Sequence, residues 1–297
     1  MSNAYTGTTR QFSTPYLTLG EYKNAPTSID IDNLVFNSQD PDVQDSELSN
    51  VIARASSWID TYCNQVIAAT VETEQQRSRL STDGSIRLHP RYSPVVALMS
   101  FNYGYPPSLG TLADCSIAWI EDQEIIVPNA TLGSWTSQGP LQFGIGAGGP
   151  SNEIFMKYTY VAGYANTTIA SPAAAGATTL SVADGTGILA GQMLKIYNGQ
   201  YSENVTVAST YTFDSDTVPL TRPLVYAQTV GTSISALPPA IKEAAVLVTT
   251  SFLKTRGDSS MTMGITTTPS NGLPNADKVG QEIALAMQLL QPYRRIR

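Results

Sequence analysis

Charged residues are scarce in this chain. Lys, Arg, Asp and Glu make up 14% of the 297 residues, against about 25% in a typical globular domain. The formal net charge is −7, which argues against a protein that grips nucleic-acid phosphates with a basic surface. Thr, Ser, Ala, Gly and Tyr replace much of the missing charge. These residues favour strands and turns whose surfaces neighbouring molecules can cover, so the composition indicates oligomerisation.

Histidine and cysteine are scarcer still. His89 is the single histidine, and Cys63 and Cys115 are the two cysteines. Three such widely spaced residues give no zinc-ligand pattern and no disulfide framework. Because no Gly-x-Ser-x-Gly motif occurs, we interpret His89 as a surface or strand-end histidine, with a catalytic role as the alternative. Cys63 falls on the apolar face of an expected helix, which predicts a buried, reduced thiol.

Long apolar segments are also missing. Residues 1–12 contain no apolar stretch of a signal peptide, and no run of about 18 apolar residues occurs elsewhere. The expectation is a soluble protein that is made in the cytosol and has no membrane partner.

Acidic residues are grouped at expected turns. The groups are Glu121 with Asp122 and Glu124, and Asp214 with Asp216. We interpret them as solvated turn residues, with a glycosidase-like carboxylate pair as the alternative. The segments 30–32 and 40–42 resemble a calcium loop only loosely. We therefore predict no catalytic residue, no metal ligand and no cofactor.

Apolar periodicity predicts three helices. The first begins at Asp40 and Pro41, with Asp as cap and Pro in the first turn, and its apolar residues up to Cys63 lie on one face. The second follows the pair Pro238-Pro239 and has an apolar stripe over 241–253. The third carries its apolar face over 279–290 and stops at Pro292. Isolated helices shorter than about 12 to 15 residues are marginal in water, so we expect the last two to pack on the first.

Strand-forming segments occupy the chain between the first and second helices. Short runs of β-formers are separated by Pro and Gly clusters, and Asn198-Gly199 predicts a tight turn between two of them. The predicted fold class is α+β, a small helical bundle of one N-terminal and two C-terminal helices interrupted by antiparallel β insertions. The predicted parts are an N-terminal arm (1–39), a helical core (40–80 with 238–297), a β-rich region (81–164) and an inserted all-β module (165–237).

Charge is unevenly distributed along the sequence. Residues 238–297 contain seven Lys or Arg and four Asp or Glu. Because the whole chain carries −7, residues 1–237 carry −10. The chain thus has an acidic body and a basic end.

The order of several segments resembles the head-to-tail adaptor, or connector, proteins of long-tailed bacteriophages. The segments similar to the opening helices of that family are 16–22 and 48–62. Those similar to its C-terminal helices are 237–244, 254–257 and 289–295. Segments 177–182, 190–192 and 201–203 are similar to a β module that recurs in phage virion proteins. Segments 87–90 and 160–164 are similar to parts of longer adaptors. The smallest adaptors are helical bundles without β excursions, which leaves open which face meets which partner.

This resemblance implies a structural protein of the virion neck that is assembled in the host cytoplasm. It implies a ring of twelve copies seated on the portal protein, with a stopper or tail terminator as the next partner. Double-stranded DNA would pass through the lumen without sequence-specific binding, and an acidic body suits such a channel.

The resemblance also implies that the C-terminal segment reaches the portal. Its candidate partner-binding residues are Pro292, Tyr293, Arg294, Arg295 and Arg297. Tyr293 offers a flat anchor, and the arginines offer charged forks to carboxylates. The alternative is a solvated basic tail.

Two other functions remain open. One is a β-rich tail, decoration or adhesion protein of the virion, and the other is a carboxylate-dependent hydrolase. The packing of the helices would distinguish a tail, decoration or adhesion protein from an adaptor. An adaptor needs its three helices packed as one bundle, whereas an adhesion module would bury its strands and leave the helices peripheral.

Overall fold

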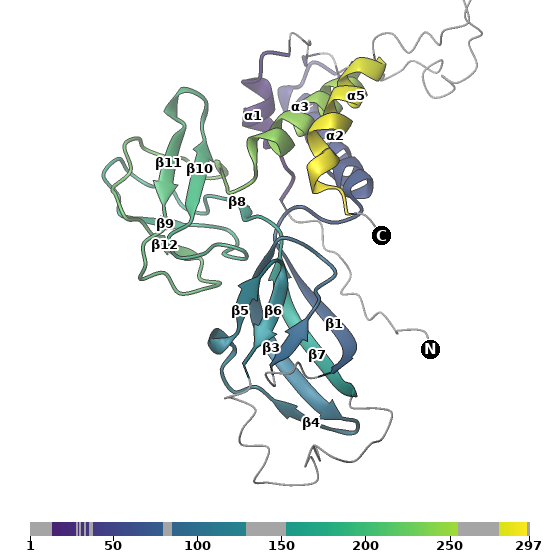
Figure 1. Cartoon of the computed structure of the whole chain (residues 1–297). Helices are drawn as coiled ribbons and strands as arrows, with labels where there is room; N and C mark the ends of the chain where they lie inside the picture. The colour runs from purple at the N-terminus through teal and green to yellow at the C-terminus, as the bar shows by residue number, and fades with distance from the viewer. Residues whose placement is uncertain are drawn as a thin grey trace, which may run out of the picture. The chain divides into compact units, whose positions relative to one another are not determined.

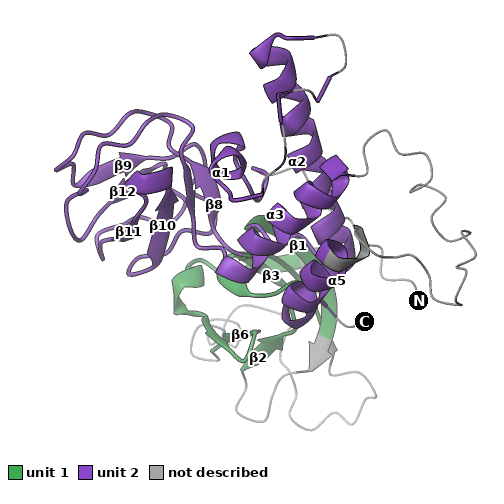
Figure 2. Ribbon diagram, turned by 90° about the horizontal axis from the view of Figure 1, so that it is seen from above, with its two compact units in different colours: residues 1–11, 69–163 green, residues 12–68, 164–297 purple. Residues whose placement is uncertain are grey.

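The computed structural model describes residues 14–27, 29, 31–32, 34–35, 38–79, 85–128, 153–254 and 279–295 (Figure 1). The chain divides into two units, which are coloured in Figure 2. Unit 1 comprises residues 1–11 and 69–163, and unit 2 comprises residues 12–68 and 164–297. Within the described residues, no helix is long and apolar enough to span a membrane.

Three helices from distant parts of the sequence form a bundle in unit 2. They are α2 (Pro41–Cys63), α3 (Pro239–Lys254) and α5 (Val279–Leu290). The Asp40 side chain caps α2 by accepting a hydrogen bond from the Asp42 N–H, and α2 ends at Asn64, whose φ is +56°. The predicted apolar faces meet in one core, in which Ile59, Val248 and Leu290 are almost fully buried. The predicted bundle is confirmed.

Two short elements complete the helical part. Helix α1 (Leu19–Lys23) lies in the segment predicted as an N-terminal arm, and Thr18 and Glu21 form its capping box. The 3-10 helix η5 (Gln291–Tyr293) follows α5 directly, at the predicted proline stop.

An all-β module follows Tyr164 within unit 2. One antiparallel sheet has the order β11-β10-β13-β8, and β12 pairs with β9. The strands are β8 (Asn166–Thr168), β9 (Thr179–Ser181), β10 (Met193–Tyr197), β11 (Glu203–Thr206), β12 (Thr217–Pro219) and β13 (Ser233–Ser235). The predicted turn at Asn198-Gly199 does join β10 to β11. It is longer than a two-residue hairpin loop because it contains the 3-10 helix η4 (Gly199–Tyr201).

The described residues of unit 1 form two antiparallel sheets, of order β1-β7-β3-β4 and β2-β6-β5. The elements are β1 (Thr70–Arg79), β2 (Ile86–Leu88), β3 (Val95–Tyr105), β4 (Ser108–Thr111), η1 (Cys115–Ile117), β5 (Trp119–Glu121), β6 (Glu124–Val127) and β7 (Glu153–Ala162). The core of unit 1 is built on buried Phe101, Tyr158 and Tyr160. With the bundle and the module, these sheets confirm the α+β fold class.

Strand β1 departs from the sequence-based division of the chain. The sequence predicts that residues 70–79 belong to the helical core, but they pair in register with β7 along their whole length. Their inward positions carry polar residues, and the carboxylate of Glu74 accepts hydrogen bonds from the hydroxyls of Tyr158 at 3.2 Å and Tyr160 at 2.6 Å. Alternation of apolar and polar residues, the usual strand signal, is therefore missing from β1.

Candidate functional site

The predicted portal-binding segment lies against the bundle of its own chain. Tyr293 is partly buried, and its ring meets that of Tyr164 edge-on, with 6.5 Å between centroids and 79° between planes. The carbonyl of Tyr293 accepts a hydrogen bond from Gln65 Nε2 at 3.0 Å. Pro292 is exposed within η5, and Arg297 lies outside the described residues.

Arg294 and Arg295 join this segment to the end of α2. The Arg295 N–H donates to the Cys63 carbonyl at 2.9 Å. The exposed Arg294 places its guanidinium carbon 5.4 Å from the centroid of the Tyr62 ring, a cation–π contact. Four of the five predicted residues are thus brought together on one surface, and up to Arg295 the segment is a docked turn rather than a solvated tail.

Aromatic residues that sequence analysis did not assign to the site support it from α2. Trp58 and Tyr62 stack with 5.6 Å between centroids and 5° between planes. The Tyr62 hydroxyl donates to the carbonyl of Met287 in α5 at 3.2 Å. Their spacing of four residues on one helix can be read from the sequence, but the partners of Tyr62, Met287 and Arg294, lie more than 200 residues away.

Cys63 ends α2 beneath this segment. It is completely buried, and burial, followed by the nearby Asp60 carboxylate, raises the pKa of its thiol to about 12. The predicted buried, reduced thiol is confirmed.

Tyr16 fastens the N-terminal segment across the same bundle. Its N–H donates to Ser56 Oγ at 3.1 Å, its hydroxyl donates to the Asp60 carboxylate, and that hydroxyl also accepts the Ile67 N–H at 2.9 Å. Because Tyr16 is 2% exposed, burial raises the pKa of its hydroxyl, with the charge of Asp60 as the second cause.

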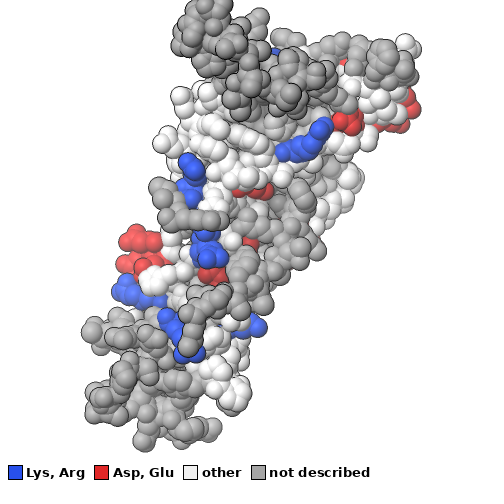
Figure 3. Space-filling view, turned by 90° about the vertical axis from the view of Figure 1, so that its right-hand side faces the viewer, with Lys and Arg blue, Asp and Glu red and all other residues white. Residues whose placement is uncertain are grey.

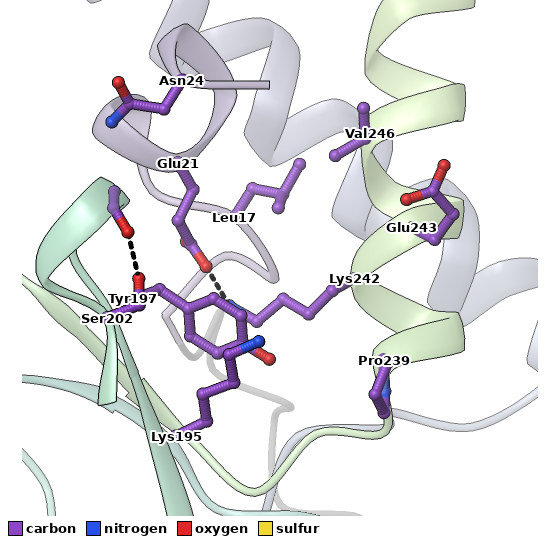
Figure 4. Close-up of a pocket in the computed structure, with 11 residues that line it drawn as sticks. Leu17, Glu21, Asn24, Lys195, Tyr197, Ser202, Pro239, Lys242, Glu243 and Val246 are labelled. Carbon is purple, nitrogen blue, oxygen red and sulfur yellow. Dashed lines mark hydrogen bonds and ion pairs between the residues drawn. The ribbon is translucent and has the colours of Figure 1, made fainter. Parts of the chain in front are cut away.

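An ion pair lies in an open cavity of about 290 Å³ between α1, α3 and β10 (Figure 4). Lys242 Nζ is 2.7 Å from the Glu21 carboxylate and 3.1 Å from Ser233 Oγ. It also stands 4.4 Å from the centroid of the Tyr197 ring. The side chains of Lys242 and Glu21 are only 8% and 7% exposed.

This ion pair connects three parts of unit 2. Burial lowers the pKa of Lys242, and the Glu21 carboxylate opposes that shift. One contact thereby joins α1, the bundle and the β module, because Glu21, Lys242 and Tyr197 come from these three parts. The charges of Lys242 and Glu21 are thus paired with each other, whereas Glu243, which also lines the cavity, is exposed.

The residues considered for catalysis lie elsewhere, in unit 1. His89 Nδ1 is 3.0 Å from a Glu124 carboxylate oxygen, and Glu121 faces Glu124 across the two-residue turn that joins β5 to β6. His89, Glu121 and Asp122 are exposed, as expected for a solvated turn.

The second acidic group also lies at a turn. Asp214 has a φ of +64° and accepts a hydrogen bond from the Thr186 hydroxyl at 3.2 Å, and Asp216 is exposed. Within the part of the chain that the structure describes, no three His, Cys, Asp or Glu side chains are arranged to hold a metal ion.

Comparison with known proteins gives one weak similarity. No protein-family model and no curated protein matches the sequence. Among solved structures, the chain is similar to one described as "Neck of empty GTA particle computed with C6 symmetry". The two chains are 12% identical over 95% of this chain and 94% of that one, with a TM-score of 0.35. A similarity of this size does not establish a shared fold or function.

Proposed function

We propose that this chain is a structural subunit of a tailed-phage neck. In this proposal its copies form a ring that connects the portal to the tail and lets double-stranded DNA pass through the channel. The observation that carries the proposal is the bundle, in which α2 packs with α3 and α5 from the far end of the sequence. The segments that resemble phage adaptors include these helices, and their packing is what an adaptor requires.

The bundle favours this function over a β-rich tail or decoration protein. Such a protein would hold its core in the strands and carry the helices at its edge. In unit 2 the helices enclose a core of their own, and the β module has a separate one. We further propose that the role involves no catalysis, in keeping with the exposed positions of His89 and Glu121.

The first prediction concerns assembly. When the chain is mixed with the portal protein of its phage, we expect a ring of twelve copies, visible by negative-stain imaging and by mass in native mass spectrometry. An unrelated virion protein in place of the portal is the control and should give no such ring. Since rings can form only on their partner, a monomer in isolation does not contradict the proposal. A chain that stays monomeric beside the portal would.

The second prediction concerns the portal contact, which we propose for Pro292, Tyr293, Arg294, Arg295 and Arg297. Tyr293 and Arg295 hold the segment on the bundle. Deleting only residues 296–297 keeps these anchors, so we expect weaker capture on immobilised portal with unchanged thermal unfolding. Deletion from Pro292 onward should also lower stability, by about 1–3 kcal/mol. Undiminished portal capture by the longer deletion would contradict the assignment.

A further inference from the structure

Helix α5 leaves two large apolar side chains exposed. Of its 12 residues, Glu282 alone is charged. Ala286 and Leu290 face the bundle core and are fully buried, whereas Leu285 is 46% and Met287 38% exposed. Gln288 is exposed on the same outer face. Large apolar side chains left exposed beside it indicate an interface.

The neighbouring face of α2 extends this apolar area. Met287 is joined to Tyr62 by the hydrogen bond to its carbonyl, and Trp58 and Tyr62 are both partly exposed. We define the α2–α5 surface as Trp58, Tyr62, Ala284, Met287, Gln288 and Arg294. Tryptophan, tyrosine, methionine and arginine are the residues most enriched where proteins bind one another. Figure 3 shows the side of the molecule that is on the right in Figure 1, and most of the described residues visible there are uncharged.

The N-terminal end of α2 carries exposed acidic residues and one exposed apolar residue, which complement the arginine and the apolar residues of the α2–α5 surface. Figure 2 shows this N-terminal end extending beyond the other helices. Asp40 and Asp42 are exposed there, and beside them Val43 is 39% exposed. At about 1.5 Å per helical residue, Val43 lies roughly 23–29 Å from Trp58 and Tyr62 on the same helix. The two surfaces therefore cannot meet within one copy.

We infer that the α2–α5 surface of one copy receives the N-terminal end of α2 from a second copy. Val43 would cover Met287, and the carboxylate of Asp42 would meet the guanidinium of Arg294 at the rim of the α2–α5 surface. Because the two surfaces differ, the contact is head-to-tail, and such contacts repeat from copy to copy until the rotation closes a ring. The inference rests on the proposed ring, for which it supplies the subunit contact.

Cross-linking tests the contact directly. In a Cys115→Ser background, which leaves only buried Cys63, Val43→Cys and Met287→Cys are combined and the assembled chain is treated with a short bis-maleimide. We expect a ladder of covalent oligomers. The matched control combines Val43→Cys with Val225→Cys, which places the second thiol at an exposed site of the β module and should leave the chain monomeric on a denaturing gel.

A charge exchange gives the second readout. Asp42→Lys and Arg294→Glu should each weaken association by about tenfold or more, and their combination should restore most of it. Arg222→Glu, at an exposed arginine of the β module, should change association less than about twofold. Circular dichroism would verify that each variant is folded. Restoration separates this contact from loss of portal docking, because a second substitution at Asp42 cannot repair a contact that Arg294 makes with the portal.

Two outcomes would overturn the inference. If rings form but the Val43/Met287 pair gives no ladder and the charge exchange has no effect, this contact is wrong and the neck function stands. If no oligomer forms with or without portal, both the contact and the proposed ring are wrong.

Discussion

Replacing Tyr16 with alanine is expected to lower the free energy of unfolding of unit 2 by about 3–5 kcal/mol. The substitution removes a nearly fully buried aromatic ring from the bundle core. It also removes the hydroxyl that binds the Asp60 carboxylate and the Ile67 N–H. Urea denaturation followed by circular dichroism would measure the loss.

The matched variants separate these two contributions. Tyr16→Phe keeps the ring and loses the hydroxyl, so the expected loss is about 1–3 kcal/mol. Tyr226→Ala truncates a tyrosine that is 40% exposed in the β module, and it should change stability by about 0.5 kcal/mol or less. If Tyr16→Ala cost no more than Tyr226→Ala, the segment around Tyr16 would not be docked in solution.

Replacing Glu21 with glutamine is expected to cost about 3–5 kcal/mol, because it leaves the Lys242 ammonium buried without its opposite charge. Removing both charges with Glu21→Gln and Lys242→Met should recover most of that loss, since a buried pair repays little more than its own desolvation. Urea denaturation of the single and double variants would measure the coupling between the two residues.

The exposed ion pair between Lys23 and Asp45 provides the control. Both side chains are 37% exposed, so Lys23→Met should cost at most about 1 kcal/mol. A loss for Glu21→Gln as small as that for Lys23→Met would show that the pair at Lys242 is solvated. The proposed union of α1, the bundle and the β module through this pair would then be wrong.

Sequence patterns predicted the elements whose burial follows a regular period. The apolar stripe ending at Cys63 and the stop at Pro292 place α2 and α5 correctly, because one-sided burial and proline act locally. The same patterns missed β1, whose inward residues such as Glu74 are satisfied by hydrogen bonds. When the hydrogen-bond partners of an inward polar residue lie on another strand, the local sequence carries no sign that the residue is buried.

The contacts that hold the candidate site could not be predicted from the sequence, because they join residues that are far apart along the chain. Glu21 and Lys242 are 221 residues apart in sequence, and Tyr62 meets Met287 and Arg294 across a similar separation. A lysine in an amphipathic helix is normally a solvated residue. Only the folded chain places Lys242 beside an acid from an N-terminal segment, and only the fold shows that Tyr293 and Arg295 are anchored.

The entry and exit of each β segment lie side by side in unit 2. Tyr164 donates its N–H to the Ile67 carbonyl at 2.9 Å, and Ala236 donates to the Ala165 carbonyl at 2.8 Å. The chain therefore leaves at one point, completes a folded excursion and returns to nearly the same point. Such joints let evolution lengthen, exchange or discard a whole excursion while the remaining polypeptide keeps its path.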